Sequence, residues 1–270
     1  MKFPAITSKF YRKIGLVVLS GILSIFIFPS YDVELLAWVA FVPLFAALEQ
    51  ENLNNAFWLG WVAGVIHFLG TLYWVIVAMV LYGNIPRVVG VAVLLLMAVY
   101  LSLYVGSFCM IVRYLQQKTV LPLIITAPVA WVGLEYLRTF FLLGFPWNLL
   151  GYSQFLTLYV TQIADITGVY GVSFLVVLVN ACLYTCLFSR TSRWMKIKTA
   201  VVTMCCVSLC VGYSLFTFSS EESAKTGNPE HDSSSQIVRV AVIQGNIDQG
   251  VKWNPNYRQQ ILDEYIRLSE

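Results

Sequence analysis

Long apolar runs, separated by short polar or turn-forming segments, dominate the first four-fifths of the chain. A helix needs about 20 mostly apolar residues to cross the roughly 30 Å of hydrocarbon in a bilayer. The pattern therefore predicts an all-α polytopic membrane bundle of about seven transmembrane helices. The predicted spans are residues 14–28, 35–48, 56–81, 88–112, 120–137, 169–188 and 197–218.

The first two runs are short, and they can instead form one tight helical hairpin. Pro29 would end the first helix and Asp32 would lie in the turn. The first run also has the basic flank and apolar centre of a signal peptide. No small-residue cleavage site follows it, and further spans come directly after, so we expect it to be retained. Its basic flank consists of Lys2, Lys9, Arg12 and Lys13.

Composition excludes an ordinary water-soluble domain. The chain is 59% hydrophobic and 11% charged, whereas soluble domains carry about 25% charged residues. A net charge of +3, scattered among apolar runs, does not indicate a nucleic-acid partner. The six cysteines all fall in apolar runs, which is typical of small packing residues. No CxxC pair occurs and both histidines are distant in sequence, so we predict neither a metal site nor a cofactor.

The basic residues predict the orientation of the spans, because Lys and Arg stay on the cytoplasmic side of short loops. With a cytoplasmic N-terminus, only Arg87 and Arg138 fall in the opposite loops. An odd span count then places everything after Phe218 outside the cytoplasm, and an error of one span would reverse that step. The basic residues on the inside are Lys2, Lys9, Arg12, Lys13, Arg113, Lys118, Arg190, Arg193, Lys196 and Lys198.

The remaining residues predict a linker and an unfinished domain. Residues 219–236 are polar and rich in Ser and Glu, as in a linker. In residues 237–243, apolar side chains alternate with Arg239 and Ala241 and many are β-branched, which predicts a strand. In residues 256–270, the apolar side chains are spaced as on one face of a helix, which predicts a helix. One strand and one helix bury too little apolar surface to fold alone. We therefore expect further residues, or a separate chain, to complete this domain.

Two charged residues near the end of the fifth run are the main candidates for function. Glu135 and Arg138 lie three residues apart, and a charge inside a membrane helix costs about 2.5 to 3.5 kcal/mol. At this spacing they share a helix face and can neutralise each other. Two interpretations stay open: an interfacial pair whose Arg reaches the headgroups, or a pair that shapes an outward-opening pocket.

The segment that follows, LGFPWNLLGYSQ at 143–154, mixes helix-breaking and aromatic residues. It predicts an interfacial or re-entrant loop on the same side as the tail, with Phe145, Trp147 and Tyr152 as lipid-facing candidates. An aromatic belt without further function is the alternative. His67, in the third run, is interpreted only as a helix-to-helix hydrogen bonder.

Three stretches together resemble the apolipoprotein N-acyltransferase family of bacterial inner membranes. They are GFPWNLLGYSQ (144–154), ITGVYGVSFLVVLVNA (166–181) and VRVAVIQGNIDQGVKWNP (238–255), and WVGLEYLR precedes the first. The resemblance covers essentially the whole chain and aligns with the N-terminal half of the family. It implies a membrane bundle at 1–218, a linker at 219–236, and the start of a periplasmic α/β nitrilase-like (αββα) domain at 237–270.

The resemblance implies transfer of an acyl chain from a phospholipid to the N-terminal diacylglyceryl-cysteine of lipoproteins. In the family a Cys thiolate takes the acyl group, a Glu acts as base and a Lys stabilises the oxyanion. None of the three is matched here, because Glu264 and Glu270 lie in the predicted helix and every Cys lies in the bundle. We therefore nominate no catalytic residue and expect the chain alone to be inactive.

The resemblance also implies roles for residues that do match. Glu135, Arg138, Trp147 and Tyr152 would contribute to a mouth that faces the phospholipid. In the tail, Gln244 and Asn246 would close the first strand of the nitrilase-like fold, and Lys252 and Trp253 would lie in the loop beyond it. Alternatively, these four residues serve only to pack the strand end and the loop.

Two other classes of function stay open. A transporter would be expected to show inverted repeats, and no convincing internal repeat is found. A non-catalytic membrane anchor is the third possibility.

Overall fold

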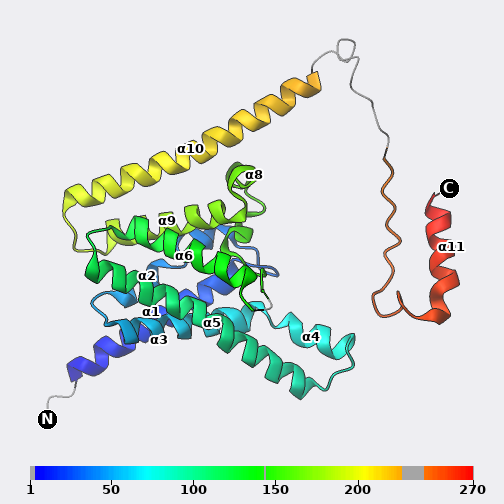
Figure 1. The fold of residues 1–270 in the computed structure, drawn as a ribbon, viewed down its shortest axis with the longest axis horizontal. Helices are drawn as coiled ribbons and strands as arrows, with labels where there is room; N and C mark the ends of the chain where they lie inside the picture. The colour runs from blue at the N-terminus through cyan, green and yellow to red at the C-terminus, as the bar shows by residue number, and fades with distance from the viewer. Residues whose placement is uncertain (1–3, 143, 227–239, 270) are drawn as a thin grey trace.

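The computed structural model describes residues 4–142, 144–226 and 240–269, and every regular element within them is a helix (Figure 1). Most of the helices pack into one bundle, and α10 lies along its outside. The elements are α1 (Pro4–Phe26), η1 (Glu34–Trp38), α2 (Val42–Leu48), α3 (Leu53–Thr71), α4 (Trp74–Leu81), α5 (Arg87–Lys118), α6 (Leu123–Phe140), η2 (Leu150–Gln154), α7 (Leu158–Thr161), α8 (Ala164–Thr167), α9 (Val169–Leu187), α10 (Arg193–Thr226), η3 (Pro255–Tyr257) and α11 (Arg258–Ser269).

Four helices, α5, α6, α9 and α10, are long and apolar enough to cross a membrane. The pair α3 and α4 makes a fifth span if the two are taken together across their 44° bend. The sequence predicted one span over 56–81, and the structure ends its first helix at Thr71. The helical membrane bundle is therefore present, while the count of seven spans stays a prediction.

Small residues let α3 and α5 pack closely. A Cβ atom at Gly60 would lie 2.5 Å from the Sγ atom of Cys109, and one at Gly64 would lie 3.0 Å from the Cα atom of Ser102. Close backbone approach through Gly-xxx-Gly spacing is a common way for membrane helices to associate. Cys109 is fully buried at this contact, as predicted for a packing residue, whereas Cys205 is exposed.

Charged residues from distant parts of the chain meet at one end of the bundle. Lys13 forms a salt bridge with Glu51 and also donates to the backbone oxygen of Glu49 at 3.1 Å. Arg113 donates to the backbone oxygen of Glu51 through Nε and Nη2, at 3.1 and 2.8 Å. Burial by itself raises the pKa of the Glu51 carboxyl, but Lys13 and Asn55 outweigh that effect and hold the pKa below its ordinary value of 4.5. The cluster ties α1 and α5 to the start of α3.

The predicted second span, 35–48, is broken into η1 and α2. Pro43 lies in the first turn of α2, where its missing N–H is tolerated, so a new helix begins there. The buried side chain of Asn180 in α9 forms hydrogen bonds with the backbone groups at this break. Its Oδ1 accepts from the Phe41 N–H at 2.8 Å. Its Nδ2 donates to the oxygen of Ala37 at 2.7 Å and to that of Val176 at 2.9 Å.

The tail agrees with the sequence in part. The helix predicted at 256–270 is confirmed over Arg258–Ser269. Of the predicted strand 237–243, residues 237–239 lie outside the described residues, and 240–248 carry neither helix nor strand. A β-strand is defined by its hydrogen bonds to a neighbouring strand, and residues 240–248 have no such neighbour among the described residues. The predicted linker is helical as far as Thr226, and 227–236 lie outside the described residues.

We expect Asn180→Leu to destabilise the bundle by about 2 kcal/mol or more, because the Phe41 N–H and the Ala37 oxygen would lose their partner in a dry environment. Thermal unfolding in detergent micelles measures the effect. Thr185→Val is a matched control, since in the described part of the chain the buried Thr185 hydroxyl bonds only to Ala181, within α9. Equal unfolding temperatures for the two variants would contradict the role given to Asn180.

Candidate functional site

Glu135 and Arg138 contact the following loop instead of each other. Both are buried in the last turns of α6, with exposed fractions of 4% and 5%. Among the described residues no ion pair joins them, so the direct pairing considered from the sequence is not formed. Glu135 Oε1 accepts from the Leu150 N–H at 2.6 Å, and Arg138 Nη2 donates to the Asn148 oxygen at 3.2 Å. They lie beneath the loop and do not reach its surface.

The loop over 144–154 is fixed by backbone geometry as well as by these bonds. Gly144 and Asn148 adopt left-handed φ angles of +64° and +55°. The Phe145 N–H donates to the Arg138 oxygen at 3.0 Å, which folds the chain back onto α6. The Gly151 N–H donates to the Ser173 hydroxyl at 2.8 Å, and a Cβ at Gly151 would lie 2.4 Å from the backbone oxygen of Val169. Only glycine allows this close approach to α9.

The end of the loop is tied to η1. Gln154 is fully buried, and its Nε2 donates to the backbone oxygen of Glu34 at 3.0 Å. The Thr157 hydroxyl donates to the Glu34 carboxylate at 2.8 Å. Loop 144–154 is thus fastened to α6, α9 and η1, which are distant in the sequence.

Exposed aromatic side chains of the loop and its flanks form what we call the aromatic rim, namely Phe140, Phe141, Trp147, Tyr152 and Phe155. Trp147 and Tyr152 are about half exposed, at 49% and 48%. Phe145 points inward instead and packs against the core cluster that contains Phe68 and Leu72. Of the predicted lipid-facing residues, two therefore lie at the surface and three lie beneath it.

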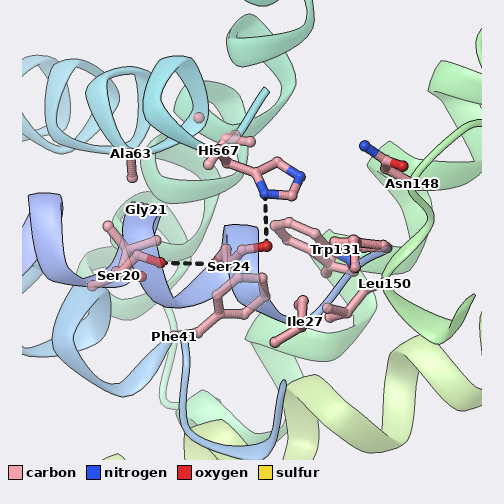
Figure 2. A pocket seen from close by; sticks show the side chains of 14 residues that line it. Ser20, Gly21, Ser24, Ile27, Phe41, Ala63, His67, Trp131, Asn148 and Leu150 are labelled. Atoms are coloured by element: carbon pink, nitrogen blue, oxygen red, sulfur yellow. Dashed lines mark hydrogen bonds between the residues drawn. The ribbon is translucent and has the colours of Figure 1, made fainter. Parts of the chain in front are cut away.

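Two adjoining pockets lie under the loop, and each has a volume of about 30 Å³. The residues lining both are His67, Val105, Trp131 and Asn148. Figure 2 shows the first pocket, with the His67 ring, Asn148 and Trp131 among the side chains around it. Glu135 and Arg138 line the second pocket, where the guanidinium lies 5.5 Å from the centre of the Phe68 ring.

His67 links two helices, as the sequence predicted. Its Nδ1 lies 3.1 Å from the backbone oxygen of Ser24 in α1 (Figure 2). Because a carbonyl oxygen can only accept, Nδ1 carries a proton, and in the neutral ring Nε2 is then an acceptor.

Four residues that hold this arrangement together received no role from the sequence: Asn148, Gln154, Ser173 and Asn180. The available signal was the presence of polar side chains within apolar runs, where they are costly unless bonded. Their partners are mostly backbone groups of broken segments, which no side-chain pattern reveals. The site as a whole consists of bonds that position a loop, and we assign no catalytic role to it.

Comparison with known proteins agrees with the resemblance found in the sequence. Residues 20–182, more than half of the chain, match the family described as Apolipoprotein N-acyltransferase N-terminal domain. A protein named Apolipoprotein N-acyltransferase from Geobacter metallireducens is 38% identical over 270 residues, which cover 99% of this chain and 49% of that protein. The protein of the same name from Pasteurella multocida is 29% identical to this chain, over 93% of this chain and 46% of that protein. The chain thus spans about half the length of the curated relatives it matches.

We expect Glu135→Ala to loosen the loop, because the Leu150 N–H loses its acceptor and a buried donor left unpaired costs about 1 to 3 kcal/mol. Hydrogen exchange at the Leu150 amide should become faster by about tenfold or more. Glu135→Gln is the matched control, since its amide oxygen can still accept from Leu150. Exchange at Leu150 that is unchanged in Glu135→Ala would show that the carboxylate does not hold the loop.

Proposed function

Because the chain belongs to the apolipoprotein N-acyltransferase family, we propose that it forms the membrane part of an enzyme that N-acylates lipoproteins. The acyl chain would come from a phospholipid, and the acceptor would be the N-terminal diacylglyceryl-cysteine of a lipoprotein. The structural observation that supports this function is loop 144–154, which is held rigidly from below and presents half-exposed Trp147 and Tyr152.

Loop 144–154 would serve as the mouth through which lipid substrates reach the enzyme. Both substrates are anchored in the bilayer by acyl chains, so they must arrive from the side. Trp and Tyr favour the depth of the lipid headgroups, because their rings are apolar and their N–H and O–H groups are polar. Glu135 and Arg138 would act indirectly, by holding the loop that carries these aromatic side chains.

The proposed orientation places this mouth on the periplasmic side of the inner membrane. The distribution of Lys and Arg favours a cytoplasmic N-terminus. The contacts of Lys13 and Arg113 with Glu51 support a common cytoplasmic side for the ends of α1, α3 and α5 that meet there. Seven spans would include α1 and the Glu34–Leu48 segment in addition to the five apolar spans. Residues 237–270 would then begin the nitrilase-like domain on the same side as the loop.

A strand at 237–243 would need other strands as hydrogen-bond partners, from the same polypeptide or from a separate chain. We propose no catalytic role for the side chains of this sequence, because the resemblance gives none of them the part of the family's Cys, Glu or Lys. The alternatives of a transporter and of a simple membrane anchor gain no support from the relatives, which are named as acyltransferases.

The proposal predicts that this chain can replace the matching half of a family member. We expect a chimera of residues 1–270 with the downstream half of the Geobacter metallireducens relative to restore lipoprotein N-acylation in cells depleted of their own enzyme. Mass spectrometry of a lipoprotein N-terminal peptide measures the added acyl chain. A chimera that accumulates in the membrane but does not acylate, while the intact Geobacter protein does, would contradict the proposal.

In the same chimera, Trp147→Ala should slow acylation at limiting phospholipid. Loss of an aromatic contact of about 1.4 kcal/mol corresponds to about a tenfold lower rate. Trp194→Ala is the matched control, because Trp194 is also exposed, at 74%, but lies at the start of α10. If both variants acylate at the parental rate, Trp147 has no part in lipid access.

A further inference from the structure

The two pockets under loop 144–154 form one space, lined mainly by apolar side chains but also by a few polar groups, and for these groups we call it the polar chamber. His67, Val105, Trp131 and Asn148 line both pockets, so the pockets share a wall. The chamber lies among α1, α3, α5 and α6 and extends to the carboxylate of Glu135. It therefore places polar groups of α3 and α6 and of loop 144–154 together in the interior of the bundle.

Four buried side-chain atoms at the chamber make no hydrogen bond of good geometry within the described part of the protein, although the Trp131 and Ser173 side chains both lie near the Glu135 carboxyl. Three are donors, namely Trp131 Nε1, Arg138 Nε and Asn148 Nδ2, and the fourth is the acceptor Glu135 Oε2. The second ring nitrogen of His67, Nε2, adds an acceptor. Buried polar groups are almost always hydrogen-bonded, because burial without a partner is costly. Something within the chamber must therefore satisfy them.

Size and charge identify the chemical class of that partner. A cavity needs roughly 10 to 15 Å³ to hold one water molecule, so each pocket of about 30 Å³ has room for one or two. An anion would lie against the Glu135 carboxylate and a cation against the Arg138 guanidinium. Water both donates and accepts, which fits a set of donors and acceptors of mixed charge.

We propose that the polar chamber is a binding site for ordered water within the membrane bundle. The water links Glu135, Arg138 and Asn148, under the loop, to His67, which is itself bonded to Ser24 of α1. Loop 144–154 thus rests on a hydrated layer, and water takes the place of a direct ion pair between Glu135 and Arg138. This inference does not depend on the acyl-transfer function.

Solid-state NMR of the isotope-labelled protein in phospholipid bilayers tests the proposal through magnetisation transfer from water to indole N–H groups. The N–H of Trp131 should receive strong transfer. Trp61 is the matched control, because its indole donates to the backbone oxygen of Val99, at 3.3 Å. Transfer to Trp131 that is no stronger than transfer to Trp61 would overturn the proposal.

A pair of glycine variants provides a second test. Asn148 and Asn84 both adopt left-handed φ angles, +55° and +49°, which glycine tolerates, but only Asn148 reaches the chamber. Asn148→Gly should weaken transfer to Trp131 and lower the Tm, whereas Asn84→Gly should change neither. Equal behaviour of the two variants would count against a water site at Asn148. The comparison of Trp131 with Trp61 in the unaltered protein remains decisive if Asn148→Gly does not fold.

Discussion

Lipid offers no hydrogen bonds, so each peptide group that leaves a helix inside the bilayer needs a partner within the protein. The polar side chains of this bundle follow from that constraint. Asn180 bonds the peptide groups at the break between η1 and α2. Glu135, Arg138 and Ser173 do the same for the loop after α6. Residues that appear anomalous in an apolar sequence are those that make irregular backbone possible.

The long spans could be predicted because the thickness and apolar nature of the bilayer determine the length and composition of an apolar run. The runs at 88–112, 120–137 and 169–188 correspond to α5, α6 and α9 with small changes at the ends. The interruptions were harder to predict, because the broken segments stay apolar throughout. Pro43 was the local sign of the break before α2, whereas no proline marks the 44° bend after Thr71.

The site could be predicted in part, for a similar reason. The cost of a buried charge singled out Glu135 and Arg138, and Gly and Pro residues singled out the loop that follows them. Their mutual arrangement was not accessible, because each charged side chain bonds a backbone group of the loop. The inward turn of Phe145 and the burial of Gln154 likewise depend on tertiary packing that single-sequence patterns do not contain.

The fastening of early segments by Asn180 has a consequence for biogenesis. During synthesis, Ala37 and Phe41 emerge long before their partner Asn180 in α9, and the loop after α6 emerges before Ser173. Until α9 arrives, these peptide groups must remain hydrated or sheltered by the insertion machinery. Both irregular segments therefore reach their final packing late, because this packing depends on α9, a helix that enters the membrane after most of the others.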